Sequence, residues 1–93
     1  MDDAERISFL DARCPAAFRL RRLILQPQDA IDYRSVDWID TLVIVERGQL
    51  ELETGDDARA WFAEGAVLVL ADLGVQRLRN ASDTPLVLSA LSR

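Results

Sequence analysis

The apolar residues of this chain recur at every second position, and this period constrains the fold more than any other feature of the sequence. In residues 48–54, two leucines alternate with two glutamates. Side chains of a β-strand point alternately to its two faces, so this alternation predicts a strand with one apolar and one polar face. Residues 75–79 also alternate, which predicts that Gln76 and Leu78 share a face.

Two further segments are apolar at consecutive positions. Residues 41–45 and residues 66–71 consist almost entirely of β-branched residues, leucine and alanine. Strands of this composition are typically covered on both faces. We therefore expect each to lie between a core and a second layer, which is another sheet or another subunit.

Turn-forming residues separate the predicted strands at short spacing. A short helix over residues 11–23 is the alternative for one early segment, and Pro15 argues against it. The remaining predicted strands cover residues 7–10, 18–25 and 86–91. The predicted turns cover residues 26–29, 47–48, 54–57, 64–65 and 80–83.

Short strands at regular spacing indicate an all-β sandwich or barrel. The two apolar faces of residues 41–45 favour a double-sheet jelly-roll barrel over an open meander. A small five-stranded barrel of the OB type is the runner-up. The sequence contains no repeat, linker or low-complexity tract, so residues 1–93 are expected to form a single domain.

Composition excludes several classes of partner. The net charge is −5, so neither a nucleic acid nor an anionic membrane is an expected partner. Cys14 is the only cysteine, so no disulfide can form within the chain. Proteins without disulfides are typical of reducing compartments, and the cytoplasm is therefore the expected location. The acidic opening residues do not resemble a signal peptide, and no apolar run is long enough to predict a membrane span.

The region around Gly48 resembles the first conserved segment of the cupin superfamily. In that family a glutamate ligand precedes the glycine, and here the position of the glutamate is occupied by Thr41. The family's histidine pair falls on Ser35 and Asp37, or one residue earlier on Arg34 and Val36. The run from Trp38 to Gly48 also looks like a group of short bacterial cupin-like proteins. This resemblance implies a fold and a bacterial origin, and it does not imply an activity.

The second family segment is matched at Gly65 and Asn80. Between them, Gln76 replaces the third histidine, Ala71 replaces a proline and Leu73 replaces a glycine. The resemblance covers residues 23–91 and implies a double-stranded β-helix, the cupin form of the jelly-roll barrel. Family members usually hold a metal ion through three histidines and a carboxylate. This chain contains no histidine, so no metal and no other cofactor is expected.

The former ligand positions remain the candidates for a binding site. Thr41 is expected to share the inward face of its strand with Val43 and Val45, and Gln76 is expected to point into the barrel with Leu78. Together with Asp37, they are the predicted ligand-binding residues. A hydroxyl and an amide in an apolar cavity orient a small ligand by hydrogen bonding. The alternative role of Gln76 is to bind a neighbouring backbone group, and that of Asp37 is to cap a turn.

Three functions follow from these residues. The first is a metal-free, non-catalytic domain that binds a small ligand in the barrel. The second is a protein-interaction or regulatory module with a packed interior. The third is a metal-independent isomerase, in which Tyr33 acts as acid and Asp32 or Asp37 as base; because Asp32 is adjacent to Tyr33, a regular strand would separate them. An enzyme is the least favoured of the three.

Two groups of residues are expected at the surface. Trp61 and Phe62 are adjacent, so one is expected to face inward and the other outward. With Phe62 inward, Trp61 is exposed and becomes the candidate contact of a homodimer, which would add burial to a small domain. Its alternative role is to cover a side chain of its own sheet. Arg19 and Arg21 are expected to share a solvated outer face.

Overall fold

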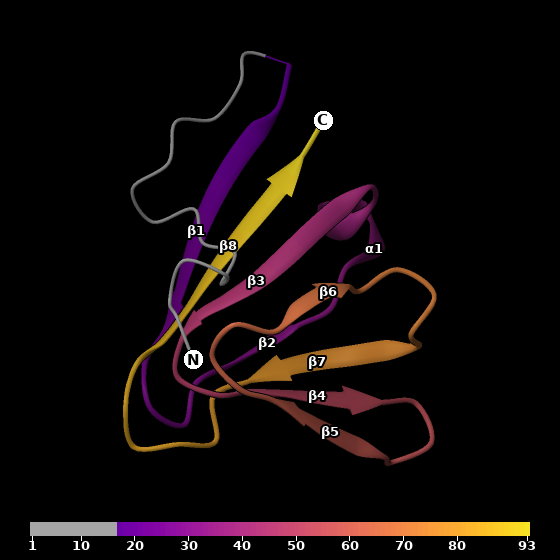
Figure 1. Ribbon diagram of the computed structural model, residues 1–93. Coiled ribbons are helices and arrows are strands. Elements are labelled where there is room, and N and C mark those ends of the chain that lie inside the picture. Colours follow the sequence, from indigo (N-terminus) through magenta and orange to yellow (C-terminus); the bar gives the residue numbers. More distant parts are fainter. Residues whose placement is uncertain (1–16) are drawn as a thin grey trace.

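A computed structural model describes residues 17–93, which form eight strands and one helical turn (Figure 1). The predicted strand at residues 7–10, Cys14 and Pro15 lie outside this range. The elements are β1 (Arg19–Leu25), β2 (Ala30–Asp32), α1 (Ser35–Trp38), β3 (Thr41–Arg47), β4 (Leu50–Thr54), β5 (Arg59–Phe62), β6 (Val67–Val69), β7 (Val75–Arg79) and β8 (Leu86–Ser92).

The strands form two four-stranded antiparallel sheets. Sheet A has the order β1-β8-β3-β6, and sheet B has the order β2-β7-β4-β5. The all-β prediction is therefore confirmed, whereas the predicted closed barrel is not what the structure contains. No strand pairing joins an edge of sheet A to an edge of sheet B within residues 17–93. One edge of each sheet is formed by a strand of only three residues, β6 in sheet A and β2 in sheet B, which offers few backbone groups for such a pairing.

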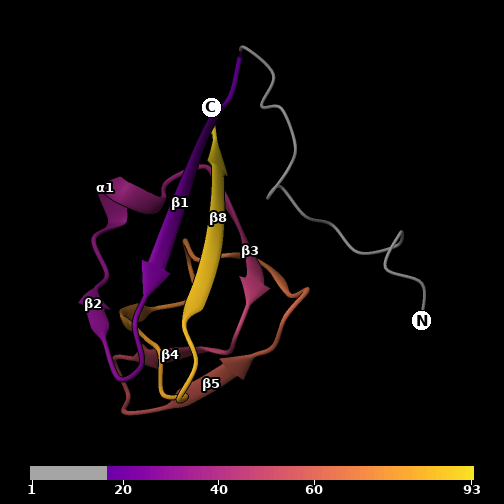
Figure 2. The same cartoon turned by 90° about the vertical axis from the view of Figure 1, so that its left-hand side faces the viewer.

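The two sheets converge at one end of the molecule and diverge at the other. Figures 1 and 2 show that β1, β8 and β3 run across the strands of sheet B at an angle. The connections β1–β2, β3–β4, β5–β6 and β7–β8, which join the two sheets, lie at the left in Figure 1, where the layers meet. The opposite end holds α1 and the connection from β6 to β7. We refer to it as the open end of the sandwich.

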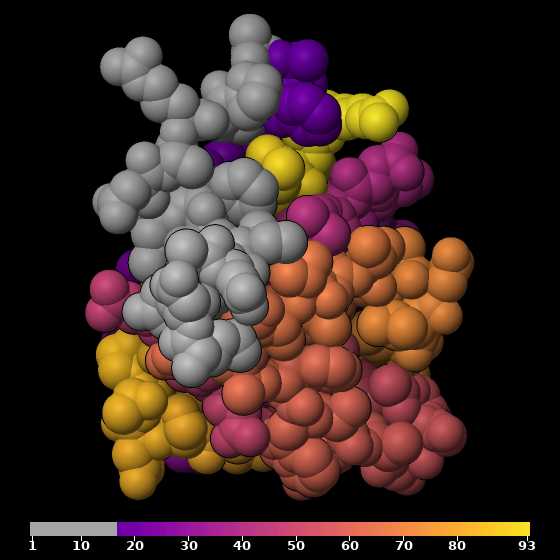
Figure 3. Space-filling view, viewed as in Figure 1, coloured from indigo at the N-terminus to yellow at the C-terminus, as the bar shows by residue number. Residues whose placement is uncertain are grey.

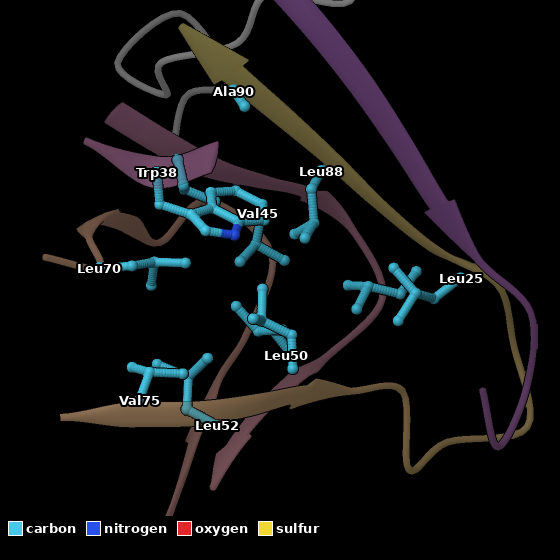
Figure 4. Close-up of a cluster of buried hydrophobic side chains, with 12 residues drawn as sticks. Leu25, Trp38, Val45, Leu50, Leu52, Leu70, Val75, Leu88 and Ala90 are labelled. Atoms are coloured by element: carbon cyan, nitrogen blue, oxygen red, sulfur yellow. The ribbon is translucent and has the colours of Figure 1, made fainter. Parts of the chain in front are cut away.

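Inward side chains of both sheets fill the space between the layers (Figure 4). The core consists of leucine and valine side chains with one alanine, Ala90, and one tryptophan, Trp38, which lies at the open end. Val43 and Val45 of β3 lie in this core, while Ile44 is fully buried on the other face of the strand. The prediction that residues 41–45 are covered on both faces is thus confirmed.

The same prediction for residues 66–71 is wrong. Val67 and Val69 are exposed, because β6 is a three-residue strand at the edge of sheet A and its outward side chains face solvent. The preferred strand at residues 18–25 is confirmed, and the alternative of a helix over residues 11–23 does not hold where the structure describes that range. From Arg19 the chain is β1, which pairs with β8 along its whole length.

The predicted face of Arg19 and Arg21 needs a correction as well. Leu23 and Leu25 of the same strand point toward the core, and strand alternation places Arg19 and Arg21 on that inner face. Both arginines remain exposed because they lie at the end of β1 where the sheets have diverged.

Candidate functional site

The helical turn α1 closes the core at the open end. Trp38 is its last residue and is only 2% exposed. The guanidinium of Arg21 lies 5.3 Å from the centroid of the Trp38 ring and also donates a hydrogen bond to the carbonyl oxygen of Asp37. A guanidinium over an aromatic face is attracted by the ring quadrupole. These two contacts attach α1 to the first strand of sheet A.

A hollow of about 690 Å³ lies beside α1, and we call it the mouth hollow. In the space-filling view, the magenta residues that lead into β3 stand directly above the orange residues that follow β6 (Figure 3). The hollow combines an apolar wall with hydroxyl and carboxylate groups. The lining residues are Tyr33, Ser35, Val36, Ile39, Asp40, Val69, Ala71 and Asp72.

Two carboxylate-bearing residues in this lining have an unusual backbone. Asp40 has φ 51° and Asp72 has φ 70°, both in the left-handed region that few residues other than glycine, asparagine and aspartate adopt. Asp40 ends the connection from α1 to β3, and Asp72 belongs to the turn after β6. Each of the two residues therefore forms part of a tight turn and also supplies a carboxylate to the lining of the hollow.

Tyr33 joins the mouth hollow to the core. It packs against the core cluster, and its backbone N–H donates to the carbonyl oxygen of Gln76 at 2.8 Å. The predicted pairing of Tyr33 with an aspartate is not formed. Asp32 makes an ion pair with Arg77 on the outer face of sheet B, at 3.6 Å, and Asp37 makes one with Arg34 at 3.9 Å.

Thr41 lies where the sequence predicts. It is buried on the face of β3 that carries Val43 and Val45, and its hydroxyl donates to the carbonyl oxygen of Ile39 at 2.9 Å. Thr41 and Asp37 line a second hollow of about 290 Å³ at the same end, together with Arg19 and Arg21. The structure therefore brings two of the three predicted site residues together.

Gln76 lies apart from them, and the prediction that it points inward with Leu78 is wrong. The register of β7 against β4 shifts between Glu53 and Thr54: Glu53 pairs with Arg77, but Thr54 pairs with Val75. Gln76 is thus the extra residue of a β-bulge, which breaks the alternation of side chains. Val75 and Leu78 both face the core, while Gln76 is exposed.

The exposed amide of Gln76 lines a hollow of about 200 Å³ beside the β4–β5 turn. In that turn Asp56 accepts hydrogen bonds from the hydroxyl of Thr54 and from the backbone N–H of Ala58. The hydroxyl of Thr54, followed by backbone N–H groups, holds the pKa of Asp56 below its ordinary value. This carboxylate stabilises the turn through these two hydrogen bonds.

The residues at the former ligand positions do not fit a transition metal. The hydroxyl of Thr41 is already bonded to a backbone carbonyl, and the exposed Gln76 lines a different hollow from Thr41 and Asp37. Within residues 17–93, no three histidine, cysteine, aspartate or glutamate side chains come together to hold a metal ion. A hydroxyl, an amide and one carboxylate that do not converge are a poor donor set for zinc or iron.

Trp61 has the orientation that the sequence predicts. It is 54% exposed on the outer face of β5, while Phe62 packs against the core. Its neighbour across the sheet is Glu51 of β4. The side chain of Glu51 is only 3% exposed although it lies on the outer face. The predicted polar face of β4 is therefore present, but its neighbours cover Glu51.

Most residues of the mouth hollow carry no sequence signal of a binding site. Val36 and Ile39 are apolar residues in a segment that follows neither strand nor helix period, and this was the available signal. Nothing in the local sequence indicates that Val69 and Asp72, some thirty residues further on, lie beside them. That proximity depends on the pairing of β3 with β6.

No known family model matches the chain, and no curated protein matches it. Among the described residues, none of the helical structure is long and apolar enough to cross a membrane.

Proposed function

We propose that this chain is a cupin-like jelly-roll domain that binds a small amphipathic molecule in the mouth hollow without transforming it. The strand order supports the jelly-roll assignment. The first strand pairs with the last, the second with the seventh, the third with the sixth and the fourth with the fifth. This is the order that results when one long hairpin is wound into two Greek keys. The cytoplasm is the proposed location.

The mouth hollow is the observation that carries the binding proposal. Its volume of about 690 Å³ lies within the roughly 300–1,000 Å³ of small-molecule sites. Val36, Ile39, Val69 and Ala71 offer apolar contact, and the hydroxyls of Tyr33 and Ser35 offer hydrogen bonds. Carboxylates in two of the lining turns favour a cation. The best-matched ligand is therefore an amine with an apolar body.

The positions of the acid and bases predicted from the sequence support binding without catalysis. Tyr33 lines the mouth hollow, but Asp32 is committed to Arg77 on the outer face and Asp37 to Arg34. General acid–base catalysis requires both groups within hydrogen-bond reach of one substrate. The proposed role of Asp40 and Asp72 is to hold a positive charge.

Titration of the ¹⁵N-labelled protein with 2-phenylethylamine tests this proposal, with 2-phenylethanol as the neutral probe. We expect the amine to shift the backbone signals of residues that line the mouth hollow. The double variant D40N/D72N is expected to weaken amine binding about tenfold and to leave the neutral probe unaffected, because it removes only charge. Signals that stay unchanged in saturating amine would refute the proposal.

Two neighbouring valines provide a matched control. Val69 lines the hollow and Val67 of the same strand does not, although both are exposed. We expect V69S to weaken binding of both probes and V67S to weaken neither. Equal effects of the two substitutions would mean that the probes bind elsewhere on β6.

A protein-interaction module is the second candidate. Val36, Ile39, Val69 and Leu73 are all exposed near the open end, and contiguous exposed apolar residues often mark binding surfaces. The packed core between the sheets agrees with this candidate as well. The same titration separates the two, because a module of this kind gives no saturable response to small amines.

A further inference from the structure

The outer face of sheet B carries two rows of side chains that run across all four strands. The strands β2, β7, β4 and β5 lie side by side in Figure 1, and their register aligns the outward residues. In strand order from β2 to β5, the first row is Asp32, Arg77, Glu53 and Arg59, and the second is Ala30, Arg79, Glu51 and Trp61.

The charges of these rows alternate in sign. Three arginines and three carboxylates leave the face without net charge, although the chain as a whole carries −5. Two acidic chains therefore repel each other least when they approach through this face. The outer face of sheet B is thus a suitable surface for contact between two copies.

Contacts within the chain leave part of this charge uncompensated. Glu51 lies 3.8 Å from Arg59 and 3.9 Å from Arg79, and its Oε2 atom is buried with no hydrogen-bond partner among the described residues. Glu53 makes no ion pair within residues 17–93. Glu53 is partly exposed, so a guanidinium group that a partner placed over this face could reach its carboxylate and would be stabilising.

A two-fold axis parallel to the strands and midway between β7 and β4 makes the face complementary to itself. This operation reverses the strand order, so β2 faces β5 of the second copy and β7 faces β4. In the first row, Asp32 meets Arg59 of the second copy and Arg77 meets Glu53. In the second row, Arg79 meets Glu51 of the second copy, and the small side chain of Ala30 meets Trp61.

The alternative axis, in the plane of the sheet but perpendicular to the strands, gives the opposite result. Each strand would then face itself and the two rows would exchange. Arg77 would meet Arg79 of the second copy, and Glu51 would meet Glu53. Like charges in contact disfavour an interface, so the pattern on this face selects the axis parallel to the strands.

We propose that two copies of this chain associate through the outer face of sheet B about an axis parallel to its strands. Trp61, 54% exposed in the single chain, is covered by the second copy and covers its Ala30. Four strands at about 4.8 Å spacing give a face roughly 19 Å wide, which is at the small end for a stable interface. The association is therefore expected to be weak, with a dissociation constant on the order of micromolar, and sensitive to salt.

Two charge reversals test the proposed pairing. E53R places an arginine opposite Arg77 of the second copy, and R77E places a glutamate opposite Glu53. Each variant alone is expected to associate at least tenfold more weakly in sedimentation equilibrium. Mixed together, the two variants restore every opposite-charge contact in the first row. An equimolar mixture is therefore expected to regain the mass of two chains, one of each kind by native mass spectrometry.

Matched controls carry the same charge changes away from the face. Asp83 and Arg47 are exposed in other parts of the molecule, so D83R and R47E are expected to leave the association unchanged. The variant W61A is a second test of the interface. Trp61 is half-exposed, so its truncation is compatible with folding, and we expect the variant to associate about tenfold more weakly.

Three results would overturn the proposal. The first is an unmodified protein with the mass of one chain at about 200 μM in low salt, well above the expected dissociation constant. The second is a mixture of folded E53R and R77E that stays at the mass of one chain. The third is an association that W61A does not weaken. None of these measurements involves the mouth hollow, so their outcome is independent of ligand binding.

Discussion

Asn80 links the two sheets through a single side chain. Its Nδ2 group donates to the carbonyl oxygens of Leu25, at 3.0 Å, and Thr84, at 2.7 Å. Its Oδ1 atom accepts from the backbone N–H and the hydroxyl of Ser82, at 3.1 and 2.7 Å. The side chain is fully buried with its whole hydrogen-bonding capacity used. It thereby joins the end of β1 to the turn between β7 and β8.

Replacement of Asn80 by alanine is expected to lower the free energy of unfolding by about 2–4 kcal/mol, because it removes four hydrogen bonds and takes the side-chain partner from the carbonyl of Leu25 and the backbone N–H of Ser82. Urea denaturation followed by circular dichroism measures the loss. S82A removes one of these hydrogen bonds and is the graded control, with an expected loss of about 1 kcal/mol. An N80A variant as stable as the parent would show that water replaces the amide.

At the scale of elements, turns and one bulge determine which side chains face the core. The bulge at Gln76 rotates the start of β7 so that Val75 and Leu78 are both buried. Gly48 follows the last residue of β3 with φ +85° and lies close to the connection that leads into β8. A Cβ atom at this glycine would lie 2.7 Å from the carbonyl oxygen of Pro85. The corner therefore requires glycine for two reasons.

A comparison of Gly48 with Gly74 separates the effect of the positive φ from that of the close approach to Pro85. Gly74 has a similar φ of +69°, but a Cβ atom there would have no neighbour within 4 Å. We expect G74A to cost about 1 kcal/mol from backbone strain alone and G48A to cost about 2–4 kcal/mol from strain plus the collision with Pro85. Thermal and urea unfolding of the two variants provide the comparison. Equal losses would mean that the Pro85 segment moves aside freely.

At the scale of the whole molecule, the charge and the donor groups are distributed unevenly. The open end gathers Tyr33, Asp40 and Asp72 around an apolar wall, while the outer face of sheet B carries a balanced lattice of arginine and carboxylate. Two carboxylates of that lattice, those of Asp32 and Glu51, are opposed by guanidinium groups within the chain, which makes them poor ligands for a metal ion. Ligand binding and self-association are thus proposed for separate surfaces.

The metal content of the purified protein tests the prediction made from the missing histidines. We expect elemental analysis by plasma mass spectrometry to find far less than one iron or zinc ion per chain, before and after incubation with each metal. Loading followed by removal with a chelator should leave the melting temperature unchanged, because bound metal would stabilise the folded state. One retained metal ion per chain would contradict the prediction.

Local pattern predicted much of the strand content but not the candidate site. The alternation in residues 48–54 and the apolar run in residues 41–45 marked β4 and β3 because such periods depend only on neighbouring residues. Gln76 was misplaced because a bulge is defined by two strands, and the sequence of β7 contains no sign of its partner's register. The exposure of Val69 likewise depends on β6 lying at a sheet edge.

The sequence by itself determined that the chain is built of short strands, that no histidine is present to bind a metal ion, and that Trp61 and Phe62 point to opposite faces of their strand. These properties follow from side-chain chemistry and from the period of a strand. Only the tertiary structure decided that Val36 and Asp72 share a hollow and that charges on four strands align in rows. Both require particular strand pairings between distant segments, and no local preference determines which strands will pair.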